Sequence, residues 1–346
     1  MAKRARRKIN LALQGGGSHG AVTWGVVDRL LEDDRLDIEA ISGASAGAVN
    51  AAALAYGLHL GGADAARAKL DELWSAICKA GAVYSPVRRS PFEIWTRDLK
   101  LDDSISYQAF DILTRVFSPY QFNPFNINPL REILERCIDF DDLRSCTATK
   151  LFLSATNVRS GKSHLFETKD VSVDSVLAST CLPFLFKAVE IGGDHYWDGG
   201  YMGNPPLYPF IYNAQSSDIV IVHVNPLDRD EVPMTAPEIL NRINEISFNA
   251  SLLRELRAIS FAEKLIDEGW LKKKYRDRLR AIRIHSIRSD KALEDLSVAS
   301  KFSTDWAFLT DLKARGRKTA DDWLAENFDA IGKKSSVDVR AMFDSR

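Results

Sequence analysis

The feature that most constrains the fold of this chain is a G-x-S-x-G motif, Gly43-Ala44-Ser45-Ala46-Gly47. It stands between a short apolar stretch, residues 38–41, and a run of small residues, 48–55, which predicts a strand that turns sharply into a helix. A serine at such a turn projects its hydroxyl from the backbone, and the helix N-terminus favours developing negative charge. Side chains larger than alanine would collide at the flanking Gly43 and Gly47. Taken alone, the same letters also fit a serine that only caps a helix.

A second strand-to-helix turn lies upstream and is rich in glycine. Residues 9–13 predict a short buried strand, a helical pattern begins after residue 20, and between them stands Gln14-Gly15-Gly16-Gly17-Ser18-His19-Gly20. Consecutive glycines leave backbone N–H groups uncovered, as an oxyanion hole requires. The letters also match the G-x-G-x-x-G of dinucleotide-binding folds, but those expect an acidic residue at the end of the second strand, where this chain has Ser42. The pattern therefore favours an oxyanion loop made by Gly15, Gly16 and Gly17.

A third motif, Asp198-Gly199-Gly200, stands far downstream of the other two. It follows an apolar segment, residues 188–191, so we expect a strand that runs into a loop and holds one carboxylate in a fixed place. An Asp-Gly hairpin turn is the ordinary alternative.

In their order, the three motifs resemble the patatin-like phospholipase family over residues 9–210, as do the surroundings at residues 179–184 and 204–206. The resemblance implies a Ser-Asp dyad, with Ser45 as the nucleophile and Asp198 as the proton acceptor. It implies an oxyanion hole made by the amides of Gly15, Gly16 and Gly17, and no metal or cofactor. The residues expected to support the motifs are His19, Gly20, Gly43, Gly47, Gly199 and Gly200. This chain departs from the family at His19, where arginine or lysine is frequent.

The histidines are poor candidates for a third catalytic residue. An α/β-hydrolase triad needs a histidine after its acid, and only His223 and His285 follow Asp198. Both stand in strand-like runs, where a packed imidazole is the ordinary role. A carboxylate alone is a weak base, since an ordinary aspartate has a pKa of about 3.9. A dyad therefore requires a partly desolvated site with preorganised donors.

The composition agrees with a cytoplasmic enzyme. The chain has 346 residues, of which 45% are hydrophobic, enough for a full α/β core. A net charge of −1 argues against a dedicated nucleic-acid binder. The four cysteines show no paired spacing, which is typical of reduced thiols. The basic N-terminus is followed by too few apolar residues for a signal peptide, and no run reaches the roughly 18 apolar residues of a membrane span.

The alternation of strand and helix patterns predicts an α/β fold with a mostly parallel central sheet flanked by helices. We expect a catalytic domain over residues 9–225 and a mainly helical C-terminal extension, 226–346, packed on the same domain. Apolar residues at three- and four-residue steps from Ile239 to Leu256 predict a long amphipathic helix in this extension. Its apolar face packs on the core or, in a second interpretation, forms a homodimer.

Two further features leave alternatives open. An aromatic-rich insertion over residues 84–125 is either a satellite hydrophobic cluster or a lid or acyl-chain pocket. Two basic segments, 3–8 and 272–283, are either solvated faces or a contact with an anionic membrane.

These observations predict a lipid acyl hydrolase of the phospholipase A or lysophospholipase type, working through an acyl-Ser45 intermediate on a phospholipid or another acyl ester. We expect it in the cytoplasm, with peripheral membrane contact. Two alternatives remain: an acyltransferase or a hydrolase of another ester or thioester on the same dyad, and a lipid-binding or scaffold protein without catalysis.

Overall fold

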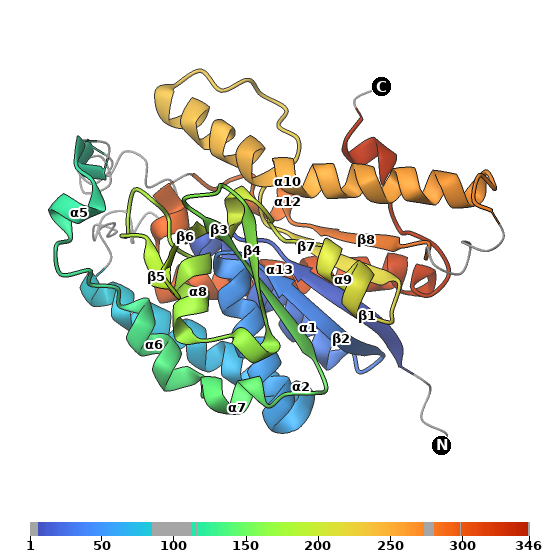
Figure 1. Ribbon diagram of the computed structural model, residues 1–346, viewed down its shortest axis with the longest axis horizontal. Helices are drawn as coiled ribbons and strands as arrows, with labels where there is room; N and C mark the ends of the chain where they lie inside the picture. The colour runs from blue at the N-terminus through green and yellow to red at the C-terminus, as the bar shows by residue number, and fades with distance from the viewer. Residues whose placement is uncertain (1–5, 85–111, 115, 273–279, 298, 345–346) are drawn as a thin grey trace.

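A mixed sheet of eight strands forms the centre of the molecule (Figure 1). The computed structural model describes residues 6–84, 112–114, 116–272, 280–297 and 299–344. The strand order is β5-β6-β3-β2-β1-β7-β8, and β4 pairs with β3. The strands are β1 (Arg7–Leu13), β2 (Leu36–Gly43), β3 (Lys150–Asn157), β4 (Ser163–Glu167), β5 (Val189–Ile191), β6 (Asp194–Asp198), β7 (Asp218–His223) and β8 (Arg283–Arg288).

The pairing of the strands confirms a mostly parallel sheet. Strands β3, β2, β1, β7 and β8 run parallel to one another, while β4 and β6 pair antiparallel with β3, and β5 pairs antiparallel with β6. The central strands β1 and β7 are buried along nearly their whole length, which explains why they read as continuous apolar runs rather than as alternating patterns.

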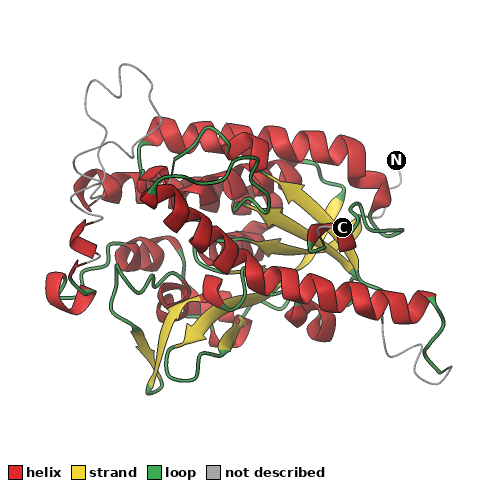
Figure 2. Cartoon of the chain, turned by 90° about the horizontal axis from the view of Figure 1, so that it is seen from above, coloured by secondary structure: helices red, strands yellow, loops and turns green. Residues whose placement is uncertain are grey.

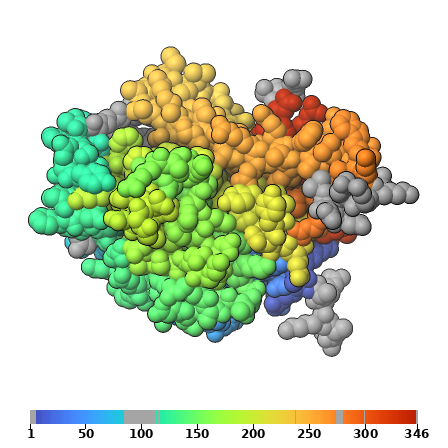
Figure 3. Space-filling view, in the orientation of Figure 1, coloured from blue at the N-terminus to red at the C-terminus, as the bar shows by residue number. Residues whose placement is uncertain are grey.

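Helices cover both faces of the sheet, as the view from above shows (Figure 2). They are α1 (Gly20–Glu32), α2 (Ala46–Tyr84), α5 (Pro119–Phe122), α6 (Leu130–Cys137), α7 (Phe140–Arg144), α8 (Val173–Ser179), α9 (Tyr208–Asn213), α10 (Ala236–Asp267), α12 (Asp290–Leu293) and α13 (Trp306–Asn327). The 3-10 turns are η1 (Gly17–His19), η2 (Thr168–Asp170), η3 (Gly199–Tyr201), η4 (Ala299–Phe302), η5 (Phe328–Ala330) and η6 (Arg340–Met342). On the face that the space-filling view shows, the green, yellow and orange segments largely cover the blue N-terminal residues (Figure 3).

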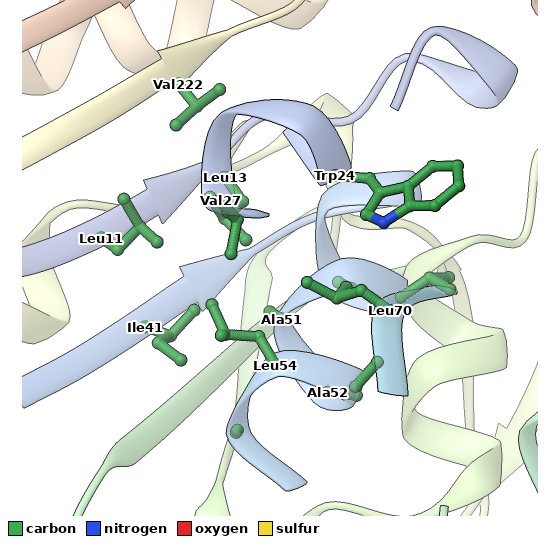
Figure 4. Close-up of a cluster of buried hydrophobic side chains, with 14 of the residues drawn as sticks. Leu11, Leu13, Trp24, Val27, Ile41, Ala51, Ala52, Leu54, Leu70 and Val222 are labelled. Carbon is green, nitrogen blue, oxygen red and sulfur yellow. The ribbon is translucent and has the colours of Figure 1, made fainter. Parts of the chain in front are cut away.

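Two hydrophobic cores hold the layers together. The larger core joins one face of the sheet to α1, α2 and α13, and Figure 4 shows Leu11, Leu13 and Ile41 of the strands meeting Leu54 and Leu70 of α2. The smaller core joins the other face to α9 and α10. Burial of each such side chain contributes about 1.5–3 kcal/mol, so the sheet between the two cores is the rigid part on which a site can be built.

Glycines shape the helical layers in two ways, by a bend within one helix and by a close contact between two others. In α2, the backbone of Gly61 and Gly62 is not helical, so a bend divides α2 into two helical segments. Between α1 and α13, a side chain on Gly25 would overlap the Lys313 carbonyl, and one on Gly316 would overlap the Val22 carbonyl. The C-terminal helix therefore lies directly against the first helix of the chain.

The C-terminal residues complete the sheet as well as covering it. The expected division at residue 225 falls between β7 and β8, which pair along their whole length. Among the described residues, no helix is both long and apolar enough to cross a membrane. All four cysteines lie in the described part and none of them forms a disulfide. Most of the insertion at 84–125, and with it the predicted lid, lies outside the described residues.

Candidate active site

Ser45 stands at the turn between β2 and α2, as the motif predicts. Its backbone φ is 54°, in the left-handed region that is costly for a residue other than glycine. Hydrogen bonds hold the turn in place: the Ser45 amide donates to the carbonyl and the hydroxyl oxygen of Ser179, both at 3.1 Å, and the Ser45 carbonyl accepts from the Ala48 amide at 2.8 Å. The structure thus fixes a half-buried hydroxyl at the first turn of a long helix.

The glycines around Ser45 leave no room for any side chain. A Cβ atom on Gly47 would overlap the Leu13 carbonyl, and one on Gly43 would lie 2.5 Å from the Gly47 carbonyl oxygen. The requirement is stricter than the sequence indicated, since even alanine would collide. Gly15 lies directly against the serine, because a Cβ on Gly15 would lie 2.5 Å from the Ser45 Cβ.

Asp198 is the last residue of β6 and is completely buried. Its backbone is anchored on both sides: its amide donates to the Cys181 carbonyl at 2.8 Å, and its carbonyl accepts from Thr156 Oγ1 at 2.8 Å. Its Oδ1 accepts from the Gly200 amide at 2.7 Å. A side chain on Gly199 would overlap the Ser154 carbonyl, so the D-G-G motif lets the chain turn tightly and return an amide to the carboxylate.

The Asp198 carboxyl is poised to exchange a proton near neutral pH. Burial raises its pKa to about 7, although the Ser45 side chain and the Gly200 amide pull the pKa downward. Among the described residues, Oδ2 has no hydrogen-bond partner of normal geometry. Burial without a compensating cation is a standard way to shift an acid into the range of a general base.

The glycine loop is fixed by a buried network of amide side chains. Gln14 Oε1 accepts from the Val224 and Asn225 amides, each at 2.8 Å, and Asn225 Nδ2 donates to the Gly15 carbonyl at 2.6 Å. The Gly15 amide donates to Asn204 Oδ1 at 2.7 Å. Of the three amides predicted for the oxyanion hole, that of Gly15 is therefore occupied.

The next two glycines keep their amides available. Within the described residues, the amides of Gly16 and Gly17 donate to no protein acceptor, and both residues line a cavity together with Ser45. Gly17 has a φ of 61°, a conformation that glycine adopts at little cost. This arrangement can present two N–H groups to a negative oxygen.

His19 does not supply the positive charge that arginine or lysine frequently provides at this position in patatin-like phospholipases. Its Nε2 lies 2.7 Å from Ser300 Oγ, which itself donates to the Ser297 carbonyl, so the histidine is the donor to Ser300. Burial, followed by the charges of Lys301 and Arg229, holds its pKa well below the usual value. The imidazole is therefore neutral at physiological pH. Gly20, the next residue, lets the start of α1 lie close to the start of α2, since a Cβ on Gly20 would lie 2.8 Å from the Ala46 Cβ.

The two histidines that follow Asp198 in sequence line neither of the cavities at Ser45. His285 Nε2 pairs with Asp218 Oδ1 at 3.0 Å. His223 is buried, and burial lowers its pKa to about 4. This geometry does not favour the triad alternative.

Two cavities meet at Ser45. One, of about 440 Å³ and here called the polar cavity, has polar groups on one wall, although most of its remaining lining is apolar; these groups are Asn204, Asn225, Asn241, Asn244 and Lys301 together with Asp198. The other, of about 550 Å³, is mainly apolar and lies between the start of α2 and α6, with Trp74, Ile77, Ile133 and Phe186 in its wall. The described end of the aromatic-rich insertion contributes Thr114 to the polar cavity and Phe122 to the apolar one.

Sequence reasoning missed three residues of this site: Asn204, Asn225 and Lys301. Asn204 stands six residues after Asp198, and the sequence marks it only as part of the stretch 204–206, which resembles the family. Asn225 follows a predicted strand directly, and its position at the carboxyl end of a parallel strand was the available signal. Lys301 had no local signal, because it reaches the site from η4, far along the chain.

The α/β fold carries a serine at a strand-to-helix turn, a buried carboxylate beside it and a glycine loop. This is the arrangement that the resemblance to patatin-like phospholipases implies. Comparison with known proteins then identifies the family, since the model of the patatin-like phospholipase family matches residues 11–211, more than half of the chain. This chain belongs to the patatin-like phospholipase family, which confirms the resemblance predicted from its motifs.

Individual relatives are distant. An uncharacterised protein of Acanthamoeba polyphaga mimivirus, R571, is 27% identical over 212 residues, which cover 58% of this chain and 61% of the viral protein. Among solved structures, VipD of Legionella pneumophila matches with a TM-score of 0.44 at 16% identity, over 94% of this chain and 67% of VipD. ExoU of Pseudomonas aeruginosa, solved in complex with SpcU, matches with a TM-score of 0.33 at 19% identity, over 94% of this chain and 61% of ExoU. The chain thus spans less than two thirds of its curated relative.

Proposed function

We propose that this protein hydrolyses carboxylic esters of lipids, with Ser45 as the nucleophile and Asp198 as the general base. The observation that carries the proposal is the completely buried Asp198 carboxyl, which interacts with the Ser45 side chain and has a pKa that burial raises to about 7. A structural carboxylate is usually paired with a cation or saturated with donors, whereas Oδ2 of Asp198 has no hydrogen-bond partner of normal geometry in the described part of the chain.

The first half of the reaction acylates Ser45. As Oγ of Ser45 attacks the ester carbonyl carbon, its proton passes to Asp198 and the carbonyl oxygen becomes negative. The amides of Gly16 and Gly17 stabilise that oxygen, while Gly15, bonded to Asn204, holds the loop in shape. The bond to the alcohol then breaks, and Asp198 returns the proton to the leaving oxygen.

The second half releases the acyl group. Asp198, again a carboxylate, takes a proton from a water molecule, whose oxygen attacks the acyl carbon. The same two amides stabilise the second tetrahedral intermediate. Its collapse returns the proton to Ser45 and frees a carboxylic acid.

The two cavities suggest how a lipid is oriented. We propose that the acyl chain enters the apolar cavity between α2 and α6, and that the alcohol portion enters the cavity lined by asparagines and Lys301. An apolar chain gains free energy from burial, whereas a polar headgroup requires hydrogen-bond partners. Ser45 borders both cavities, so the ester bond of a lipid in this orientation would meet the nucleophile.

Exposed apolar side chains at the cavity walls support contact with a lipid surface. Phe184 and Leu240 line the polar cavity and Ile127 lines the apolar one, and Phe184 is 68% exposed. Apolar side chains around the mouth of a site are typical of an interaction surface. We propose peripheral membrane contact at this apolar rim.

The basic segments supply less support for that contact. Their described members are partly engaged within the protein, since Arg280 donates to the carbonyl of Ala214 and Arg283 pairs with Asp218. Residues 1–5 and 273–279 lie outside the described residues. Co-sedimentation with anionic and zwitterionic vesicles at low and high salt distinguishes the two kinds of contact. Vesicle binding through the apolar rim should depend little on salt, whereas binding through the basic segments should weaken strongly as salt rises.

The cytoplasmic location and the homodimer through the C-terminal helices stay predictions. Light scattering of the purified protein determines the oligomeric state, and fractionation of cells that produce it determines its location.

The experiment that tests the proposed function is an assay of the purified protein on defined lipids: phospholipids, lysophospholipids and acylglycerols. We expect release of free fatty acid by the wild type and none above background by Ser45→Ala. Ser160→Ala, which removes a hydroxyl from a surface turn, is the matched control and should keep full activity. Turnover by Ser45→Ala at the wild-type rate would refute the proposal, and a wild type without activity on any ester would favour a lipid-binding protein.

A further inference from the structure

Lys301 lies at the wall of both cavities that meet at Ser45. It belongs to η4, which packs against the glycine loop so closely that a Cβ on Gly17 would lie 2.6 Å from the Lys301 carbonyl oxygen. Its Nζ donates to Asn241 Oδ1 at 3.1 Å, and Asn241 of α10 also lines the polar cavity. A normally flexible side chain is therefore held at one place in the wall of the cavities that Ser45 also lines.

The charge of Lys301 is not matched by a carboxylate of its own. Among the described residues it forms no ion pair, and the nearby Glu245 is held by Arg229 at 2.6 Å and by Arg242 at 3.3 Å. Asn241 joins the two groups, since its Nδ2 donates to Glu245 Oε1 at 2.8 Å. Among the described residues, the bonded cluster thus holds three cationic side chains and the Glu245 carboxylate, while the charge of Asp290 also acts on Arg229.

Such a surplus of positive charge in a desolvated place favours an anionic ligand. Removal from water lowers the pKa of Lys301, the nearby Glu245 raises it, and Arg229 lowers it further. An anion in the polar cavity would stabilise the ammonium by charge and by a hydrogen bond, which are worth more away from bulk water. Because His19 is neutral, Lys301 also supplies the positive charge that the glycine loop itself lacks.

We infer that Lys301, positioned by Asn241, binds the phosphate of a phospholipid headgroup and so selects phospholipids over uncharged acylglycerols. The inference rests on the proposed function, because it needs the alcohol portion of the lipid in the polar cavity. In a glycerophospholipid, the phosphate is attached to the same glycerol as the scissile ester, so both reach one cavity wall. Lys301 acts here as a specificity residue, and Asn241 as a positioning residue.

A binding experiment tests this inference independently of catalysis. In a Ser45→Ala background, calorimetry would compare a short-chain phosphatidylglycerol with the diacylglycerol of the same acyl chains. We expect Lys301→Met to weaken binding of the phospholipid relative to the diacylglycerol by about 10- to 100-fold, the range for a hydrogen bond to a charged group. Lys301→Arg should recover most of the difference. Lys318→Met, which removes an exposed lysine of α13 that pairs with Asp322, is the matched control and should bind as the parent does.

The kinetic version uses the otherwise wild-type enzyme and the ratio of kcat/KM for the two lipids. We expect this ratio to fall about tenfold or more in Lys301→Met, with thermal unfolding showing that the variant is folded. An unchanged ratio in both experiments would overturn the inference while leaving the hydrolase intact. If Lys301→Met selectively lost phospholipid binding while the wild type hydrolysed neither lipid, the inference would be supported and the proposed function refuted.

Inorganic phosphate, added at millimolar concentration to the diacylglycerol assay, distinguishes a lipid phosphate from the free ion. We expect no effect, since a free ion has no acyl chain to hold it in the cavity. Strong inhibition of the wild type that disappears in Lys301→Met would mean that the cation binds free phosphate, and would overturn the headgroup assignment.

Discussion

Two buried aspartates stand at opposite ends of the sheet and differ in almost everything except burial. Asp198 interacts with the Ser45 side chain and the Gly200 amide, pairs with no cation among the described residues, and has a pKa that burial raises to about 7. Asp218 opens β7 at the other end, where Arg283, His285 and the Gly332 amide all donate to it. Burial raises the pKa of Asp218, but these hydrogen bonds outweigh it and hold the pKa well below the ordinary value.

The difference teaches which end of the molecule serves stability and which serves chemistry. A saturated carboxylate stabilises the fold and has no reason to accept a proton, whereas an unsaturated one costs stability and can act as a base. Ser45 adds to the cost at the same end through its positive φ. We therefore expect substitutions at the two ends to have opposite consequences.

The largest expected effect is the loss of activity in Asp198→Asn. An amide cannot take the Ser45 proton, so ester hydrolysis should fall by about a thousandfold or more, as for Ser45→Ala. The variant should be at least as stable as the wild type at pH 8. The reason is that a raised pKa gives stability at low pH, which is lost as pH rises through about 7. Assays with a soluble ester, and urea unfolding at pH 5 and pH 8, measure the two quantities.

Asp218→Asn should do the reverse. Loss of the carboxylate leaves Arg283 and His285 without their partner, so unfolding should become easier by about 3 kcal/mol, the usual cost of breaking a buried pair. Activity per folded molecule should remain near that of the wild type. The lost stability is present only above the ordinary pKa of aspartate, so the gap between variant and wild type should shrink as pH falls below about 4. Urea unfolding at several pH values checks this, and an equally inactive Asp218→Asn would break the comparison.

Ser45→Gly isolates the backbone cost of the turn. Glycine adopts a φ of 54° without strain, so the variant should be more stable than Ser45→Ala by about 1 kcal/mol, although both are inactive. Thermal unfolding of the two variants gives the difference. Equal stability would mean that the hydrogen bonds around the turn, and not the conformation of Ser45, set its energy.

The smallest expected effect belongs to His223→Asn. The imidazole is buried, lines neither cavity and has a pKa lowered to about 4, so the change should alter kcat/KM by less than about threefold in the folded protein. Activity corrected for the folded fraction is the measurement. A variant as inactive as Ser45→Ala would replace the proposed dyad with a triad.

The sequence predicted the parts of the site that are encoded by neighbouring residues. The strand-turn-helix patterns at Gly15–Gly17 and at Ser45 are local, because small residues are needed wherever a strand turns sharply into a helix. The family resemblance added the pairing of Ser45 with Asp198. The strands and the C-terminal helices are predictable for the same reason, since the central strands form short continuous apolar runs and the helices have apolar residues at three- and four-residue steps.

The remaining parts depend on contacts between distant segments. Asn204 removes the Gly15 amide from the predicted oxyanion hole, and Asn225 holds the same loop, but both act across about two hundred residues. Lys301 enters the site only because η4 packs on the glycine loop. Likewise, the strand-like run around His285 predicts β8, but the place of β8 beside β7 follows from the topology of the sheet.

The pH dependence of Ser45 labelling by a fluorophosphonate tests the central claim most directly. If Asp198 is the base, labelling should occur on Ser45 alone, and its rate should rise with pH to a plateau with a midpoint near 7, the pKa of Asp198. In Asp198→Asn the rate should be at least about a hundredfold lower and should lack that midpoint. Peptide mass spectrometry identifies the labelled residue. Labelling that persists in Ser45→Ala, or an unchanged rate and pH profile in Asp198→Asn, would contradict the proposed dyad.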